Sequence, residues 1–444
     1  MKNFKLYILS GLLFVAACKP EIHNPKPSNG TANFSRFIAV GNSLTAGYSN
    51  GGLYLEGQQN SYPSIMAQQM QSVGGGVFNQ PLFTEAQANG SGYLTLTGFD
   101  PKTGNPITAP VTTDLAVRGE YNAPGFGAVF LYTKYTGDIE NYGVPGIKLL
   151  NITFPQYGNY NGYFERLLPG DGSTSVLNTD YLDFVTAKPF TFFTDWLGNN
   201  DALAYATSGG AGDVLTDKTT FAQLYELSLQ TLTKNGAKGV VATIPDVTSI
   251  PYFSTVTVAA INAGLAANAQ LTAVGLNKLY INALVSGTTY APRLATNNDL
   301  IVLTFPTSMI GTIVNTPYGP LPYGVTPYTP VDNQYVLDAN EIALTRDYVQ
   351  SYNNTIKSQA AARGLAVFDA YTYLNNVKLN GLEVNGISLS SAYITGGLFS
   401  LDGIHLTPRG YAIIANEFIK ATNSTYGSNI PLANISSYPG LKFP

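Results

Sequence analysis

The chain has 444 residues, of which 45% are hydrophobic, so it can bury one large core or two ordinary ones, and this argues against disorder throughout. Charged residues make up only 11%, against roughly 25% in an average soluble domain, while Gly, Tyr, Asn and Thr are abundant, which is typical of an extracytoplasmic protein with many ordered loops. The formal net charge of -4 and the lack of any basic run give no electrostatic signature of a nucleic-acid partner, so we expect none.

The cysteine and histidine counts restrict metal chemistry. The single cysteine, Cys18, cannot form an internal disulfide, and two histidines leave too few ligands for a Cys/His zinc site. A carboxylate-based metal site stays open, but no pattern in the sequence supports one. We expect the protein to need neither a metal nor a cofactor.

The N-terminus has the three parts of a secretory signal. Lys2 and Lys5 precede an apolar run at residues 6–17, which is too short to span a bilayer, for which about 20 residues are needed. The small residues directly before Cys18 (VAAC) resemble the lipobox of bacterial lipoproteins, in which the cysteine is lipidated and becomes the mature N-terminus. We therefore expect residues 1–17 to be a signal peptide and Cys18 to carry lipid. The alternative is an ordinary signal peptide that happens to contain a cysteine.

Residues 18–33 comprise this cysteine and a polar segment that is rich in Pro and Asn, lacks apolar periodicity and contains His23. We interpret the segment as a tether between a membrane and the folded body. The resemblance to lipoproteins implies an extracytoplasmic protein that is lipid-anchored to a bacterial membrane, with the outer membrane as the expected one.

Four apolar, β-prone runs predict the core strands. The first, at residues 37–40 (FIAV), ends on Gly41, the pattern of a buried strand that enters a tight turn. Similar runs occur at residues 190–193 (FTFF), 240–244 (VVATI) and 365–368 (LAVF). Because such runs are apolar on both faces, they indicate strands buried in a parallel sheet.

Helical patterns lie between the predicted strands. The clearest runs from Asp338 to about Arg363, where Asp338 can cap the helix with Glu341 three residues on, and Gly364 ends it. A second pattern covers residues 220–235. Since each helix leads into a strand, the order indicates repeated βα units and predicts a three-layer α/β/α sandwich with a central parallel sheet, whose ligand site lies at the carboxyl edge of the strands.

Three stretches fit this scheme poorly, near residues 73–135, 150–185 and 248–335. They are rich in Gly, Pro, Tyr, Asn and Thr and show little helical periodicity. We interpret them as long insertions, in the form of loops or short β-hairpins, within a single domain that spans residues 34–444.

The first candidate for chemistry is Ser43, in residues 41–48 (GNSLTAGY), where the first predicted strand ends. A serine there can present its hydroxyl at the sheet edge, with backbone N–H groups of the following turn free to bind an anion. Taken alone, the segment also fits an ordinary turn.

The second candidate is the pair Asp402 and His405, in residues 402–405 (DGIH). Thr407 as N-cap and Pro408 as first helical residue place the histidine in the loop before a helix. A carboxylate three residues before a histidine can accept from its Nδ1–H, which leaves Nε2 free to take a proton from a serine. The alternative is a loop histidine that caps or packs, but His405 is the only histidine in the predicted folded body.

Two further segments fit an oxyanion site. Residues 198–201 (GNND) follow a predicted strand, and an asparagine side chain there can donate to a developing oxyanion, an effect worth about 3–4 kcal/mol in hydrolases. Residues 141–146 (NYGVPG) contain glycines, which let a backbone N–H approach a ligand closely. Taken alone, the first is also an Asx turn and the second a plain turn.

In order and spacing, these four segments resemble the conserved blocks of the SGNH (GDSL-like) hydrolases. The resemblance implies that Ser43 is the nucleophile and an oxyanion donor through its N–H. It implies that Gly146 and Asn200 are the other oxyanion donors, and that Asp402 and His405 complete a catalytic triad. It covers the whole length of the chain, since the segments stand near both ends of the mature protein, and it implies the three-layer, flavodoxin-like fold described above.

One residue departs from the family pattern: Asn42 stands where these hydrolases usually have aspartate. That aspartate is not a triad member, and asparagine can make many of the same turn hydrogen bonds, so we expect activity to survive.

The resemblance implies a serine ester hydrolase, an esterase, lipase or acylhydrolase that cleaves carboxylic esters through an acyl-enzyme. Lipid esters and acylated carbohydrates both fit as substrates, and the Tyr-rich loops favour acetyl or short acyl groups on glycans. The alternative is a surface glycan- or lipid-binding lipoprotein with a vestigial triad.

Overall fold

The computed structural model describes residues 26–101, 104–123, 125, 127–170 and 178–444. The expected signal peptide, the lipidated Cys18 and the part of the tether with His23 lie outside the described residues. Within the described ranges, no helix is both long enough and apolar enough to cross a membrane.

A five-stranded parallel sheet forms the centre of the molecule, in the order β15-β8-β7-β1-β6. Because all strands run the same way, their carboxyl ends meet at one edge of the sheet. This confirms the predicted α/β fold with a central parallel sheet. The strands are β1 (Phe37–Gly41), β6 (Asn141–Gly143), β7 (Phe192–Trp196), β8 (Lys238–Ala242) and β15 (Ala366–Phe368).

Two of the expected strands were misplaced by two residues. The strand expected at residues 190–193 is β7, which continues through the buried Thr194 and Asp195, and polar residues had masked its end. The strand expected at residues 240–244 ends earlier, at Ala242. The pattern of apolar runs does not predict β6, since its three residues include an asparagine and make no such run.

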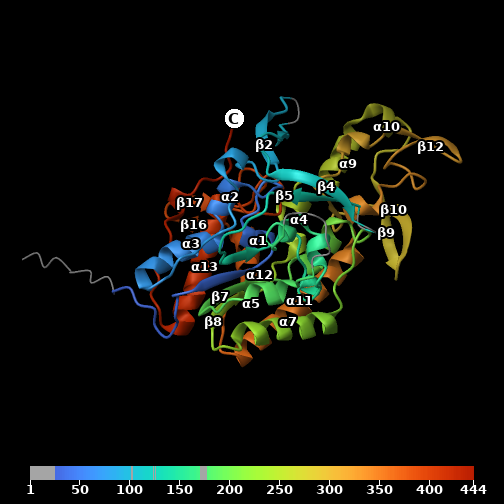
Figure 1. Ribbon diagram of the computed structural model, residues 1–444. Helices are drawn as coiled ribbons and strands as arrows, with labels where there is room; N and C mark the ends of the chain where they lie inside the picture. Colours follow the sequence, from blue (N-terminus) through green and yellow to red (C-terminus); the bar gives the residue numbers. More distant parts are fainter. Residues whose placement is uncertain (1–25, 102–103, 124, 126, 171–177) are drawn as a thin grey trace, which may run out of the picture.

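Helices cover both faces of the sheet (Figure 1). On one face α13 packs against α3, and on the other α11 packs against α6 and α7. A cluster of aromatic rings fills the core beneath α13: Phe418 stacks on Tyr62 with 4.6 Å between ring centres and lies edge-to-face with Trp196 at 5.7 Å. The flanking helices are α3 (Tyr62–Met70), α5 (Tyr181–Thr186), α6 (Asn200–Thr207), α7 (Lys218–Thr233), α11 (Ala339–Ala362), α12 (Ala370–Asn380) and α13 (Pro408–Tyr426).

Local capping signals set the helix starts. Asp338 caps α11 as predicted, with the reciprocal bond from its own N–H to Glu341 Oε2 at 2.9 Å. Thr407 and Pro408 begin α13, also as predicted, and the helix ends at Tyr426. The start of α7 lies two residues before the expected one because Asp217 caps it.

The predicted insertions contain the expected antiparallel hairpins and also several helices that the sequence pattern missed. Hairpins β2–β3 and β4–β5 occupy the first stretch, and β9–β10 and β12–β13 occupy the third, where with α9 and α10 they project from the body (Figure 1). The second stretch contains short helices and no strand among its described residues. Helices of four to ten residues carry too little periodicity to be detected. That residues 34–444 form one domain stays a prediction.

The remaining elements are short. The helices are α1 (Ser43–Ala46), α2 (Leu55–Gln59), α4 (Gly162–Glu165), α8 (Pro251–Ser254), α9 (Val258–Ala267) and α10 (Ala269–Ala273). The strands are β2 (Tyr93–Phe99), β3 (Pro106–Val111), β4 (Val117–Ala123), β5 (Gly127–Tyr132), β9 (Tyr280–Ser286), β10 (Thr289–Leu294), β11 (Leu300–Ile301), β12 (Ile313–Thr316), β13 (Gly319–Pro322), β14 (Val336–Leu337), β16 (Leu382–Val384) and β17 (Ile387–Leu389). Single turns of 3-10 helix lie at Gln71–Val73, Glu85–Gln87, Leu149–Asn151, Tyr157–Asn159, Val247–Ser249, Thr307–Met309, Asn333–Tyr335 and Ile435–Ser437.

Candidate active site

Ser43 is the first residue of α1, directly after the carboxyl end of β1. Asn42 caps this helix, since its Oδ1 accepts from the Leu44 N–H at 3.0 Å. The turn is tight: a Cβ at Gly41 would lie 2.0 Å from Thr45 Oγ1, so only glycine fits there. The turn thus brings Ser43 to the carboxyl edge of the sheet.

Ser43, His405 and Asp402 form one hydrogen-bonded chain. His405 Nε2 lies 2.8 Å from Ser43 Oγ, and His405 Nδ1 lies 2.8 Å from Asp402 Oδ2. The histidine sits in the loop before α13, so the fold joins two residues that are 362 positions apart. A carboxylate at Nδ1 favours the tautomer with a proton there, which leaves Nε2 to accept from the serine hydroxyl.

Both oxygens of Asp402 have several partners. Oδ1 accepts from the N–H groups of Ile404 at 2.9 Å and His405 at 2.8 Å, and from Ser400 Oγ at 3.0 Å. Oδ2 accepts from the Gly51 N–H at 2.9 Å as well as from His405. Burial alone would raise the pKa of Asp402, but the electrostatic attraction of His405 and the hydrogen bonds from His405 and the backbone N–H groups outweigh burial and hold the pKa well below its usual value. Asp402 is therefore ionised across the neutral pH range.

Gly146 and Asn200 lie beside the same serine. Gly146 has a φ of 83°, a conformation that favours glycine, in the loop after β6. Asn200 begins α6, after β7, and its Nδ2 donates to the Ile147 carbonyl at 2.9 Å, which orients the amide and leaves its second N–H free of that bond. Both residues line one cavity together with Ser43 and His405. The structure thus brings together all five residues of the predicted site.

Two cavities meet at the serine and the histidine. The larger, about 420 Å³, is called the large lobe, and the smaller, about 50 Å³, the small lobe. The large lobe is the more open to solvent. Four residues border both lobes: Ser43, Asn200, Leu203 and His405.

Tyrosines and the β4–β5 hairpin form much of the wall of the large lobe. The ring of Tyr48 lies 4.6 Å from that of His405, and Tyr132 stacks on Tyr163 with 4.5 Å between ring centres. Burial raises the pKa of Tyr48 well above its ordinary value, so its hydroxyl stays neutral. Sequence reasoning missed Tyr132 and Tyr163 because both lie in stretches interpreted only as insertions. The alternating aromatic residues in 127–132 (GAVFLY) were the one signal in the sequence that could have indicated the hairpin.

Hydrogen bonds from the turn after α1 hold the loop that contains Asp402. Asn50 has a φ of 52°, uncommon outside glycine, and its N–H donates to Ser400 Oγ at 2.9 Å. Its Oδ1 accepts from the Leu401 N–H at 3.0 Å, and its Nδ2 donates to Tyr54 Oη at 3.0 Å. This network joins the serine turn to the aspartate loop. Sequence reasoning missed Asn50, and Asn-Gly at a turn was the signal that could have indicated it.

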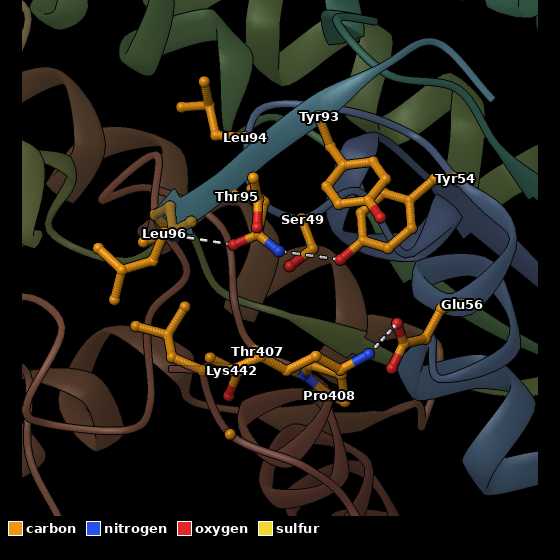
Figure 2. Close-up of a pocket in the computed structure, with 14 residues that line it drawn as sticks. Ser49, Tyr54, Glu56, Tyr93, Leu94, Thr95, Leu96, Thr407, Pro408 and Lys442 are labelled. Carbon is orange, nitrogen blue, oxygen red and sulfur yellow. Dashed lines mark hydrogen bonds and ion pairs between the residues drawn. The ribbon is translucent and has the colours of Figure 1, made fainter. Parts of the chain in front are cut away.

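A separate pocket of about 90 Å³ is lined in part by Ser49 and Asn50 of this turn (Figure 2). Tyr54 stacks on Tyr93 with 4.1 Å between ring centres, and Lys442 pairs with Glu56 at 2.7 Å. None of the five predicted site residues lines it.

No group of three or more His, Cys, Asp or Glu residues within the described ranges is arranged to hold a metal ion.

Comparison with known proteins identifies a family and finds weak structural likenesses. Residues 37–418 match the model of the family described as GDSL-like lipase/acylhydrolase. No curated protein matches the chain. A crystal structure of LAE5, an alpha/beta hydrolase enzyme from the metagenome of Lake Arreo, Spain, is similar with 11% identity over 89% of this chain and 97% of that chain, at a TM-score of 0.35, which is too low to bear on function.

Proposed function

Because the chain belongs to the GDSL-like lipase/acylhydrolase family, whose members are hydrolases, we propose that it cleaves carboxylic esters through an acyl-enzyme on Ser43. The observation that supports this most is the continuous hydrogen-bonded chain from Ser43 Oγ through His405 to Asp402, at the border of a cavity.

In the proposed reaction, His405 Nε2 removes the hydroxyl proton as Ser43 Oγ attacks the ester carbonyl. Asp402 stabilises the imidazolium that forms, and the same proton then passes to the leaving alcohol. A water molecule, deprotonated by His405, attacks the acyl-enzyme, and the acid is released with Ser43 restored.

The oxyanion of each tetrahedral intermediate would lie between three donors: the N–H groups of Ser43 and Gly146, and Asn200 Nδ2. The bond from Asn200 to the Ile147 carbonyl holds that amide in place before the substrate arrives, so little reorganisation accompanies the reaction.

For the substrate, we propose esters of acetyl or short acyl groups with a carbohydrate. The narrow small lobe has room for only a short chain, and the tyrosines of the large lobe can stack on a sugar face. A lipid ester is the competing substrate, and its long acyl chain would have to lie in the open large lobe.

We further propose that Cys18 is lipidated and attaches the protein to the outside of a bacterial membrane. The support is the sequence of the first 18 residues alone. Metabolic labelling with a fatty acid in a bacterial host tests it: label should enter the wild type and be absent from Cys18→Ala, and label in the variant would contradict it.

The first test of the proposed function uses the form that begins after Cys18, with p-nitrophenyl esters from acetate to a long-chain acyl. Ser43→Ala should lower kcat by about 10⁴-fold or more while the circular dichroism spectrum is unchanged. Ser72→Ala, which removes an exposed serine hydroxyl bonded only to its own helix, is the matched control and should keep wild-type activity. A folded but inactive wild type, or an active Ser43→Ala variant, would contradict the proposal and favour the binding protein with a vestigial triad.

A further inference from the structure

The two lobes differ in chemistry as well as in size. The large lobe has tyrosines and a hairpin in its wall, whereas aliphatic side chains from four separate segments form most of the small lobe. Since Ser43 and His405 border both, a bound ester would place one side of its carbonyl in each lobe. The aliphatic wall of the small lobe consists of Leu44, Leu203, Val247, Ile250 and Ile404.

Two buried asparagines border this aliphatic lobe and have side-chain atoms without a hydrogen-bond partner. Asn199 is 5% exposed, and neither its Nδ2 nor its Oδ1 has a hydrogen-bond partner; Asn42 is 1% exposed, and its Nδ2 has none. Among the described residues only eight buried side-chain atoms lack a partner, and three of them belong to this pair. Because a buried amide without partners is costly, we expect these amides to turn toward the lobe and pair with a ligand there.

The unpaired amide atoms of these asparagines indicate the chemistry of the ligand. Asn199 offers a donor and an acceptor side by side, and a hydroxyl group, which both donates and accepts, can satisfy both. A carboxylate would find no lysine or arginine in the lining. An unsubstituted acyl chain would fill the aliphatic wall but leave the amides unpaired.

The lobe suits the acyl side of the ester better than the alcohol side. The acyl group stays on Ser43 while the alcohol departs and water enters, and the large lobe, being wider and more open, provides that route. The acyl group is therefore the part that can occupy the more enclosed lobe through both steps.

Resting on the proposed function, we infer that the small lobe binds short acyl groups that carry a hydroxyl, and that Asn199 is the residue that selects them. The natural substrates would then be esters of short hydroxy acids, of which a 3-hydroxybutyryl ester is the simplest probe.

The test compares p-nitrophenyl butyrate with both enantiomers of p-nitrophenyl 3-hydroxybutyrate. The enzymatic rate with each ester is divided by its rate of hydrolysis by hydroxide without enzyme, which corrects for the intrinsic reactivity of the ester. The wild type should favour the better hydroxy ester by about tenfold in kcat/KM, the effect of one net hydrogen bond. Asn199→Leu, which keeps the volume but removes the amide, should bring the ratio to about one. Asn199→Thr, which keeps one hydroxyl, should retain part of the preference and serves if the leucine variant does not fold. Asn298→Leu, an exposed asparagine outside both lobes, is the matched control and should keep the wild-type ratio.

The outcomes separate the two claims. If neither ester is hydrolysed by the folded wild type, the proposed function fails. If both are hydrolysed equally and Asn199→Leu leaves the ratio unchanged, the amides bind only water, and this inference alone is overturned. A preference for a hydroxyl group on the alcohol part of the ester would be seen as faster hydrolysis of 2-hydroxyethyl butyrate than of ethyl butyrate. If the wild type shows that preference instead, and Asn199→Leu loses it, the small lobe holds the alcohol and the acyl assignment is wrong.

Discussion

Asp402 illustrates how a single side chain is held at the site. Its two oxygens accept from His405 Nδ1, one serine hydroxyl and three backbone N–H groups, which leaves it no freedom to rotate. In the proposed mechanism this rigidity keeps the imidazole of His405 in the one orientation and tautomer that can take a proton from Ser43.

Asp402→Asn should therefore lower kcat by about 10²- to 10⁴-fold, because an amide can donate to Nδ1 and stabilise the wrong tautomer of His405. KM should change little, since Asp402 borders neither lobe. Steady-state kinetics with p-nitrophenyl acetate measure both constants. A loss smaller than threefold would count against the proposed role of Asp402.

At the scale of an element, the turn after α1 is the feature that links the serine to the aspartate. Asn50 bonds both to Ser400, which in turn bonds Asp402, and to the Leu401 N–H, while the next residue, Gly51, donates to Asp402 directly. We regard Asn50 as a positioning residue, because it acts on the reaction only through the aspartate loop.

Asn50→Gly keeps the positive φ but removes the side chain, and it should lower kcat about tenfold with little change in KM. The loss should appear in kcat and not in KM, because Asn50 borders neither lobe. Asn385→Gly, at φ 51° in the β16–β17 turn, is the matched control and should keep the wild-type kcat and KM. A rise in KM as large as the fall in kcat, or an equal loss of kcat in the control variant, would contradict the positioning role.

The start of α11 joins the third insertion to the body. Asp338 is fully buried, and besides capping α11 it accepts from the N–H of Leu284 in β9. Asp338→Ala should therefore lower the free energy of unfolding by about 2–4 kcal/mol, the sum of a lost cap and an unpaired buried N–H. Asp217→Ala removes the exposed cap of α7, whose side-chain hydrogen bonds lie within the first turn of that helix, and should lower the free energy of unfolding clearly less. Urea unfolding measures both, and equal losses would contradict the joining role.

For the whole molecule, a buried carboxyl in the sheet makes stability depend on pH. Asp195, in β7, is fully buried, and burial raises its pKa to about 7, although its Oδ1 accepts from the Leu197 N–H at 3.1 Å. A carboxyl whose pKa is raised on folding stabilises the fold below the unfolded pKa of about 4, and this contribution is lost as the pH rises through 7.

Asp195→Asn should remove that dependence, so the wild type should lose about 2–4 kcal/mol more than the variant between pH 4 and pH 8. Thermal or urea unfolding across this range provides the measurement. Asp114→Asn, at an exposed carboxyl, should leave the wild-type slope unchanged. Parallel curves for the wild type and Asp195→Asn would show that Asp195 is ionised in the folded protein at pH 4.

The sequence by itself determined the local features of this protein: the strand that ends before Ser43, the caps Asp338 and Thr407, and the class of fold. These depend on residues within a few positions of one another, so their hydrogen bonds and apolar spacing can be read directly from the chain. The family resemblance added the five candidate residues and their order.

Only the tertiary structure decided which distant residues meet. The contact of Ser43 with His405, the place of β6 at the edge of the sheet, the two lobes, and the support from Asn50 all depend on how segments hundreds of positions apart pack together. The β4–β5 hairpin borders the site for the same reason. Packing of this kind produces no periodic pattern in the sequence of either segment, because the contacts of each residue depend on residues that are distant in sequence and close only in the folded protein.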